Sequence, residues 1–262
     1  MNDLEYAYLK RRLAELFDVD IGAYKAGHMR RRLETFIAHH GDGDPIALIK
    51  RADRDDGLRS KLRRTLTISV SSFFRDPGQY ALLRSAVLPD LLGDTGRLQV
   101  WSAACSRGQE PYSLAMVFLE MGVDARVRIL ATDIDEEALA VAREGGPYTP
   151  EDVGNVSRLQ MARHFVYRDG HHWLTDEVKR GVEFGKHDLI AGVSRRMFGL
   201  IACRNVLIYF EPAAKSEILR KLHRALAPGG VLFVGAAEAP MGEDSALFES
   251  LGGNFYRKRD SD

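Results

Sequence analysis

The stretch LQVWSAACSRGQEPYSLAM, residues 98–116, decides the fold of this chain. It begins with a short apolar run of strand type over 98–104, turns, and continues as a helical segment from Glu110. The same order recurs twice, because VRILATDID (127–135) and MFGLIACRNV (197–206) each precede a helical segment, and VLFVGAA (231–237) reads as a last strand. Strands alternating with helices predict a doubly wound, mostly parallel α/β sheet. We expect Gly229 and Gly230 to end the helix before the last strand.

Residues 1–66 follow a different pattern. Apolar side chains recur at helical spacing, and Asp44-Pro45 is typical of an N-cap followed by the first residue of a helix. A further helix is expected over 58–66, and Asp76-Pro77 predicts another helix start. We therefore expect a helical N-terminal domain with its linker over 1–75 and an α/β domain over 76–262.

Composition narrows the class of protein. The 262 residues are 45% hydrophobic and 28% charged, as in globular proteins with a core. Two cysteines, Cys105 and Cys203, cannot form a disulfide framework and suit a reducing cytosol. The apolar stretches fall short of the roughly 20 residues that span a bilayer, and the N-terminus lacks a signal-peptide pattern. The expectation is a cytoplasmic protein without membrane insertion and, since no Cys/His spacing indicates one, without a metal site.

The charge is unevenly distributed. Residues 1–75 contain 15 Lys and Arg against 11 Asp and Glu, and the remainder contains 22 against 26. This modest excess favours an acidic partner for the N-terminal part. Solvated helix faces explain it equally well.

Candidate ligand-binding residues follow three of the predicted strands. In an open parallel sheet, ligands bind beyond the carboxyl ends of the strands, which here are followed by 103–108, Asp133 and Arg204-Asn205. Only Gly108 follows the first strand, whereas a dinucleotide site needs G-x-G-x-x-G. A nucleoside cofactor without phosphates is therefore favoured. Asp133 is placed either to accept the two ribose hydroxyls or to cap the following helix.

The motifs SSFFRD, WSAACSRGQEPYSLAM, ATDID and CRNVLIYF together resemble those of the CheR-type chemotaxis receptor glutamate O-methyltransferases, over nearly the whole chain. The resemblance implies a class I methyltransferase sheet that binds S-adenosyl-L-methionine and releases S-adenosyl-L-homocysteine. It also implies an all-helical N-terminal domain and a small antiparallel β-subdomain, expected here near 164–184.

The resemblance also implies the site residues. Arg75 and Tyr209 correspond to the family's methyl-transfer site. The expected cofactor contacts are Ser69, Ser71, Arg75, Glu110, Asp133, Asp188, Leu189, Asn205 and Val206.

Each of these residues also has an ordinary structural interpretation. Arg75 would otherwise form a salt bridge between domains, and Tyr209 would be half-buried packing. Asn205 would be a turn residue, and Glu110 would favour the helix N-terminus that it occupies.

Glutamate methylation demands little acid–base chemistry. A solvent-accessible glutamate, with a pKa of about 4.3, is already ionised at neutral pH, so the enzyme must position the reactants rather than remove a proton. The implied substrates are glutamates on acidic chemoreceptor helices, which the basic N-terminal helices would meet. Because the turn RDGHH is short, we expect no tether to a receptor's C-terminal pentapeptide. The weak basic patch predicts no nucleic-acid binding.

Several positions depart from the family pattern. Ser69 and Ser71 stand where Asn and Thr are usual, Arg107 and Gln109 where a small hydroxyl residue and an acid are usual, and Ala236-Ala237 where His-Ser is usual. These departures leave open a catalytically weak relative that binds the cofactor and acts through protein partners. A methyltransferase for nucleic acids or small molecules is the other alternative.

Overall fold

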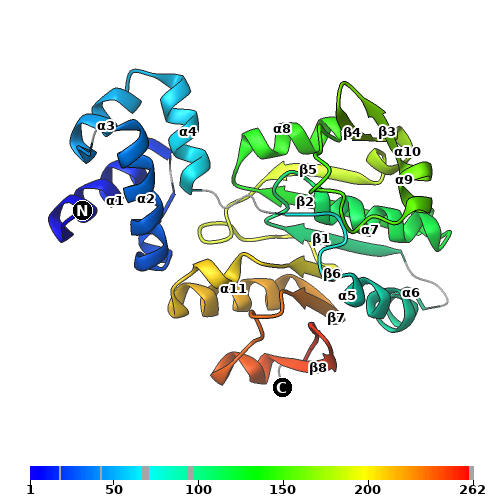
Figure 1. The fold of residues 1–262 in the computed structure, drawn as a ribbon. Coiled ribbons are helices and arrows are strands. Elements are labelled where there is room, and N and C mark those ends of the chain that lie inside the picture. The colour runs from blue at the N-terminus through cyan, green and yellow to red at the C-terminus, as the bar shows by residue number, and fades with distance from the viewer. Residues whose placement is uncertain (18, 42, 67–70, 94–96, 260–262) are drawn as a thin grey trace. The chain divides into compact units, whose positions relative to one another are not determined.

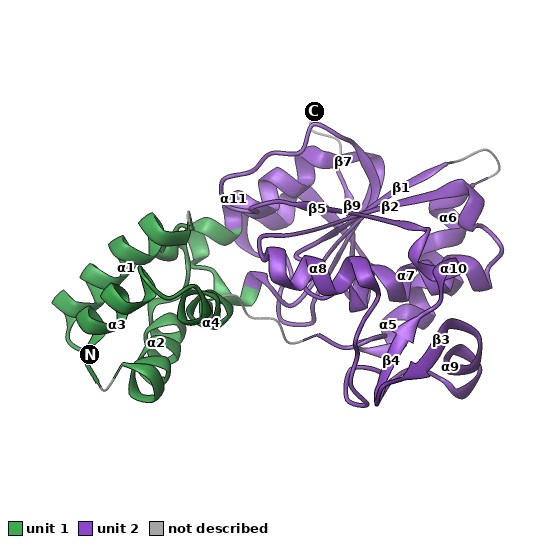
Figure 2. Ribbon diagram, turned by 90° about the horizontal axis from the view of Figure 1, so that it is seen from above, with its two compact units in different colours: residues 1–69, 208–215 green, residues 70–207, 216–262 purple. Residues whose placement is uncertain are grey.

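The computed structural model describes residues 1–17, 19–41, 43–66, 71–93 and 97–259. The chain forms two compact units, coloured separately in Figure 2. The first comprises residues 1–69 and 208–215, and the second comprises residues 70–207 and 216–262. Each is described by itself.

The first unit is helical, as predicted. Its helices are α1 (Asp3–Phe17), α2 (Ala26–His40), α3 (Pro45–Ala52) and α4 (Asp56–Leu66), with a 3₁₀ turn at Ile21–Ala23. Their apolar faces meet in a core that includes Leu9, Leu13 and Leu33, each at most 1% exposed. The Asp44 carboxylate accepts hydrogen bonds from the N–H groups of Ile46 and Ala47, which confirms the predicted N-cap.

The second unit is built on a seven-stranded sheet (Figure 1), which confirms the predicted fold class. The strand order is β5-β2-β1-β6-β7-β9-β8. The five strands from β5 to β7 are parallel, and β9 and β8 add an antiparallel edge. In chain order the strands are β1 (Leu98–Ala103), β2 (Val127–Asp133), β5 (Val182–Lys186), β6 (Phe198–Cys203), β7 (Leu226–Val234), β8 (Phe248–Gly252) and β9 (Phe255–Lys258).

Helices connect these strands. They are α5 (Pro77–Leu82), α6 (Leu88–Leu92), α7 (Gln109–Glu120), α8 (Glu136–Glu144), α9 (Arg158–His164), α10 (Asp176–Lys179) and α11 (Pro212–Ala225). A π-helical turn at Leu83–Val87 and 3₁₀ turns at Asp124–Arg126, Leu207–Tyr209 and Gly242–Leu247 complete the connections. The central strands are buried on both faces, which is why they read as continuous apolar runs.

A separate hairpin, β3 (Phe165–Arg168) with β4 (His171–Leu174), forms a two-stranded antiparallel sheet. Its two-residue turn places Asp169 at φ 52° and Gly170 at φ 77°, and Asp-Gly is favoured where both turn residues need positive φ. The expected β-subdomain range of 164–184 extends too far, because its last residues belong to β5, which pairs with β2 of the main sheet.

The expected helix stop at Gly229 and Gly230 differs from the structure. The helix before the last strand ends at Ala225, and Gly229 and Gly230 lie within β7. The pairing register between β6 and β7 shifts there, from Phe198↔Leu226 to Leu200↔Val231, and Gly229 has φ 70°. The glycines therefore serve a bulge in a strand rather than a helix stop.

The division into units also differs from the expected one at residue 75. Phe73 and Phe74 are buried in the core of the second unit, so the segment before α5 belongs to the sheet's unit. Residues 208–215, expected in the α/β domain, group with the helices of the first unit. Among the helices that the structure describes, none is long and apolar enough to cross a membrane.

Candidate active site at the carboxyl edge of the sheet

The carboxyl ends of β1, β2, β5 and β6 lie at one edge of the sheet because these strands are parallel neighbours. Most of the predicted cofactor residues that the structure describes follow these four strands or begin the helix after β1. Ser69 lies outside the described residues. Ser71 is half-buried at the start of the segment that leads to Arg75.

Asp133 is the last residue of β2 and is partly buried. Its Oδ2 accepts a hydrogen bond from the N–H of Ser106 at 2.7 Å, and its Oδ1 accepts one from the N–H of Asp135 at 2.9 Å. Burial raises the pKa of this carboxyl, and these N–H groups oppose the shift. The helix-cap interpretation is wrong for Asp133, because the cap of α8 is Asp135, whose side chain accepts from Glu137 N and Ala138 N.

Asp188 and Leu189 follow the end of β5, whose last residue, Lys186, pairs with Asp133 of β2. The N–H of His187 donates to the carbonyl of Asp133 at 3.0 Å. Asp188 Oδ1 accepts from the N–H of Ile190 at 2.7 Å, which forms a tight turn. Leu189 is buried within this turn.

Glu110 and Arg204 form the charged centre of the edge. Glu110 Oε1 accepts from the hydroxyl of Ser102 at 2.8 Å, and Glu110 Oε2 lies 3.8 Å from Arg204 Nη1. The Arg204 side chain is only 2% exposed and packs its guanidinium over the ring of Phe233, 4.3 Å from the centroid. Burial raises the pKa of Glu110, and the Arg204 charge opposes this.

The segment Phe73–Asp76 forms a tight turn that is held at every residue. The N–H of Phe73 donates to the carbonyl of Asp152 at 2.8 Å, and that of Phe74 donates to the hydroxyl of Ser113 at 2.9 Å. Arg204 Nη2 donates to the carbonyl of Arg75 at 3.0 Å and to the carboxylate of Asp76 at 2.8 Å. Four consecutive residues are therefore fixed from three segments of the unit.

Backbone geometry makes this anchoring necessary. Phe74 and Asp76 have φ of 49° and 59°, which is unfavourable for residues with a Cβ. The turn fixes the backbone of Arg75, whose side chain is half-buried. Pro77 begins α5 as predicted, but the Asp76 carboxylate pairs with Arg204 and makes no capping hydrogen bond.

Asn205, directly after Arg204, also has a left-handed backbone, with φ 60°. The buried Glu238 carboxylate accepts hydrogen bonds from Asn205 N at 2.5 Å and from Gly235 N at 2.7 Å. The residue Glu238 therefore joins the ends of β6 and β7 and sets the direction of the Asn205-Val206 segment.

Tyr209 belongs to the first unit by its contacts. Its carbonyl accepts from the N–H of Lys25 at 2.8 Å, and its ring meets that of His28 edge-on with centroids 6.3 Å apart. Arg75 and Tyr209 thus lie in different compact units.

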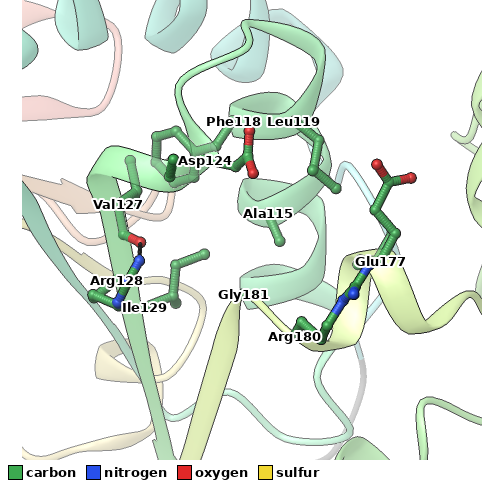
Figure 3. Close-up of a pocket in the computed structure, with 12 residues that line it drawn as sticks. Ala115, Phe118, Leu119, Asp124, Val127, Arg128, Ile129, Glu177, Arg180 and Gly181 are labelled. Carbon is green, nitrogen blue, oxygen red and sulfur yellow. Dashed lines mark hydrogen bonds between the residues drawn. The ribbon is translucent and has the colours of Figure 1, made fainter.

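A cavity of about 410 Å³ lies at the opposite end of the strands (Figure 3). It is lined by the first residues of β2, Val127–Ile129, by Ala115 and Phe118 of α7, and by α10 and Gly181. Asp133 ends the same strand β2, so this cavity is separate from the carboxyl edge. Among the described residues, no group of three or more His, Cys, Asp or Glu is placed to hold a metal ion.

Sequence analysis placed Ser106 and Arg204 among the candidates at the strand ends without assigning their partners, and it gave Asp152 no role. Arg204 did carry a signal, because a charged residue stands directly after the apolar strand β6. The Ser106 N–H and the Asp152 carboxylate bond to segments far apart in the chain, so no local sequence pattern predicts these contacts.

The residues present suit a nucleoside that carries an ammonium group and lacks phosphates. Two partly buried carboxylates, those of Glu110 and Asp133, stand at adjacent strand ends to accept hydrogen bonds from hydroxyl and ammonium donors. The loop after β1 contains one glycine, Gly108, and lacks the glycine-rich sequence that cradles a pyrophosphate.

Replacement of Arg204 is expected to destabilise the second unit strongly. Arg204→Gln leaves Glu110 buried without its cation, at a cost of about 3–5 kcal/mol. Urea unfolding followed by tryptophan fluorescence measures this cost, because Trp101 and Trp173, the chain's two tryptophans, both lie in this unit.

Arg84→Gln is the matched control. Arg84 is 51% exposed and pairs with Glu120 at 3.1 Å, and exposed pairs contribute about 0–1 kcal/mol. Equal losses in the two variants would contradict this account of Arg204.

Comparison with known proteins agrees with this geometry. Residues 69–256 match the family model described as "CheR methyltransferase, SAM binding domain". A chemotaxis protein methyltransferase from Listeria monocytogenes is 36% identical over 98% of both chains, and chemotaxis protein methyltransferase 1 from Pseudomonas aeruginosa is 34% identical over 84% of both.

Solved structures add little to this. The SAM-bound amino pentose methyltransferase CalS10 from Micromonospora echinaspora has a TM-score of 0.38 and 15% identity, and the match covers 60% of this chain and 49% of that one. A likeness this slight supports no functional argument. The sequence matches are decisive by themselves: the chain belongs to the CheR methyltransferase family, and S-adenosylmethionine is its cofactor.

Proposed function

We propose that this protein transfers the methyl group of S-adenosylmethionine to glutamate side-chain carboxylates of chemoreceptors, in sensory adaptation. The observation that carries the proposal is the Phe73–Asp76 turn, which fixes the backbone of Arg75 through four contacts. A glutamate carboxylate is ionised at neutral pH and needs no general base. Such a reaction requires positioning and a cation that orients the carboxylate, and the turn supplies a guanidinium on a rigid support.

The proposed cofactor contacts follow from the chemistry of each group. Asp133 accepts hydrogen bonds from the ribose hydroxyls, and Glu110 pairs with the ammonium group of the methionine part. Ser71, Asp188-Leu189 and Asn205-Val206 line the remainder of the cofactor, and the contact expected of Ser69 falls outside the described residues. When bound, S-adenosylmethionine would supply an electrophilic methyl group on its sulfonium sulfur for transfer to the carboxylate, with S-adenosylhomocysteine as the leaving group.

Arg75 and Tyr209 are the proposed residues of the methyl-transfer site. Arg75 orients a carboxylate, either the cofactor's own or that of the incoming glutamate, through the two N–H groups of its fork. Tyr209 donates its hydroxyl to the substrate or lines the path of the methyl group. A loose grip by Arg75 is required, because a tightly paired carboxylate is a weaker nucleophile.

The first unit is the proposed receptor-docking unit. A cavity of about 430 Å³ between α2 and α4 is lined by three arginines, Arg31, Arg32 and Arg64, together with Thr35, Phe36, His39, His40 and Thr65. Among the residues that the structure describes, the lining contains no carboxylate. Arg32 is held there by a hydrogen bond from Nε to the carbonyl of Thr65 at 2.7 Å, and burial lowers its pKa. A partly buried cation in a groove lined by three arginines favours the acidic surface of a receptor helix.

The β3–β4 hairpin is proposed to bind no receptor tail. Its turn is only two residues long, and the other edge of β4 is already bridged to Tyr148, whose N–H and carbonyl both bond to His172. The docking unit would then supply the receptor contact without a tether.

Methylation of the receptor tests the function directly. Mass spectrometry of a cognate receptor co-expressed with this protein is expected to show base-labile methyl esters on glutamates. Arg75→Ala should abolish the esters, whichever of the two carboxylates Arg75 orients. A receptor that gains no esters with the native protein would overturn the proposal.

Cofactor affinity is expected to fall on acidification. Burial raises the pKa of Glu110 above its ordinary value of 4.5, so its carboxyl takes up a proton at a higher pH than an exposed glutamate does. The neutral carboxyl cannot pair with an ammonium group, so the dissociation constant rises as the pH falls through this raised pKa and is constant well above it. Calorimetric titrations at a series of pH values measure the change.

Glu110→Gln should bind the cofactor weakly at neutral pH with a flatter profile, whereas Glu137→Gln, a substitution at an exposed residue, should behave like the native protein. A profile in Glu110→Gln as steep as in the native protein would exclude this role.

Charge reversal in the basic groove is expected to weaken receptor recognition alone. Arg31→Glu should raise the KM for receptor about tenfold, with kcat and cofactor affinity unchanged. Arg54→Glu, an exposed site outside the groove, is the control for net charge.

An isolated receptor tail pentapeptide should give no heat in a calorimetric titration with this protein, and tight binding of that peptide would disprove the absence of a tether.

A further inference from the structure

The loop after β1 contains two residues whose side chains reach the same carboxylate. Gln109 Nε2 donates to Asp152 Oδ1 at 3.0 Å, and Arg107 Nη1 lies 3.5 Å from Asp152 Oδ2. These are the two positions of the loop at which the sequence departs from the family pattern. The departures are therefore linked in space through Asp152.

Asp152 is buried, 8% exposed, and receives further donors from its own turn. The N–H of Thr149 donates to Asp152 Oδ2 at 2.9 Å, and the Thr149 hydroxyl lies 3.3 Å from the same oxygen. A buried carboxylate surrounded by donors stays in one position, because each lost hydrogen bond would leave an unpaired buried group. The side chain of Asp152 is thus a fixed anchor for the loop.

The backbone of Asp152 anchors a second segment. Its carbonyl accepts the N–H of Phe73 at 2.8 Å, at the start of the turn that supports Arg75. One residue therefore holds the cofactor loop by its side chain and the Arg75 turn by its main chain.

The loop needs such external support. Ala104 and Ser106 have φ of 63° and 51°, conformations that cost about 1–3 kcal/mol each when residues with a Cβ adopt them. The neighbouring Arg107 is held at its main chain as well, because its carbonyl accepts the hydroxyl of Tyr148 at 2.8 Å. A loop released from these contacts would relax, and the Ser106 N–H would no longer meet the Asp133 carboxylate.

We propose that Arg107, Gln109 and Asp152 form a latch that positions the cofactor loop and keeps it in register with the Arg75 turn. The three act through Ser106 and Asp133 on cofactor binding, and through Phe73 on Arg75. They are positioning residues, and none touches the reacting atoms. The proposal rests on the proposed roles of Asp133 and Arg75.

The two halves of the latch have different kinetic signatures. The side chains of Arg107 and Gln109 meet the carboxylate of Asp152 and make no bond to the Phe73–Asp76 turn. Arg107→Ala should therefore raise the KM for S-adenosylmethionine about tenfold, a size usual within one hydrogen-bond network, and leave kcat nearly unchanged. Asp152→Ala keeps the main-chain carbonyl but removes the side-chain hydrogen bonds to Thr149 and Gln109 that fix its position. The carbonyl that accepts the Phe73 N–H should then shift, so this variant should raise the same KM and also lower kcat. A residue that only supports the fold would not divide KM and kcat in this way.

The cofactor dissociation constant of the purified full chain, measured by calorimetry with S-adenosylhomocysteine and no substrate, is the first readout. Arg107→Ala and Asp152→Ala should each weaken binding, and the double variant should be no weaker than Asp152→Ala alone. Gln109→Glu places a second carboxylate beside Asp152 and should also weaken binding, and Arg107→Lys should restore part of the affinity. Arg143→Ala, which removes an exposed pair with Glu136 at 3.5 Å on α8, is the control.

Additive effects of the two substitutions, or affinity equal to that of Arg143→Ala, would overturn the latch. Because no methyl acceptor is present in this titration, its result does not depend on whether receptor glutamates are the substrate. Should Asp152→Ala fail to fold, Arg107→Ala and Gln109→Glu still decide the outcome, since both leave the Asp152 side chain and its hydrogen bonds to Thr149 in place.

Discussion

The guanidinium of Arg204 holds the carboxyl edge of this sheet together. Removing an arginine from water is costly unless its charge and donors are satisfied, and here the compensation comes from separate segments of the chain. Asp76 and Glu110 supply opposite charge, the carbonyl of Arg75 accepts a hydrogen bond, and the ring of Phe233 covers one face. These groups meet only in the folded unit. The position of each therefore depends on the same buried cation.

Strain accumulates around this interaction. Six described residues other than glycine have positive φ, and Phe74, Asp76, Ala104, Ser106 and Asn205 lie in the loops of the carboxyl edge. The sixth, Asp169, forms the hairpin turn, where positive φ is the usual requirement. Such conformations persist only where surrounding contacts over-determine them. Here the strained residues are held by the ion pairs of Arg204, the hydrogen bonds of the Glu238 carboxylate and the contacts of Asp152. These interactions keep the carboxyl edge in one conformation.

The sequence predicted the framework better than the contacts within it. Apolar runs identified the parallel strands because burial on both faces leaves a local signal. The prediction that Gly229 and Gly230 end a helix was wrong. A glycine pair before a strand is equally compatible with a helix stop and with a strand bulge, and only the β6–β7 register distinguishes them. Asp133 and Asp135 are two residues apart at a strand end, and either could have capped α8. Asp133 instead accepts the N–H of Ser106, which lies in the loop after β1, and Asp135 caps α8. The local sequence carries no signal of that contact.

The same reasoning explains why the departures in the loop after β1 leave the hydrogen bonds of the Asp133 carboxylate in place. Arg107 and Gln109 point their polar groups at Asp152, whereas Asp133 is met by a main-chain N–H of Ser106, which does not depend on the identity of that side chain. At the last strand, the acid Glu238 bonds to Asn205 N and Gly235 N without help from the side chains of Ala236 or Ala237. Where main-chain donors and buried acids set the geometry, side chains in the intervening loops are free to change, provided that their new polar groups find partners. An arginine in this loop therefore requires an acidic partner, and Asp152 is that partner for Arg107.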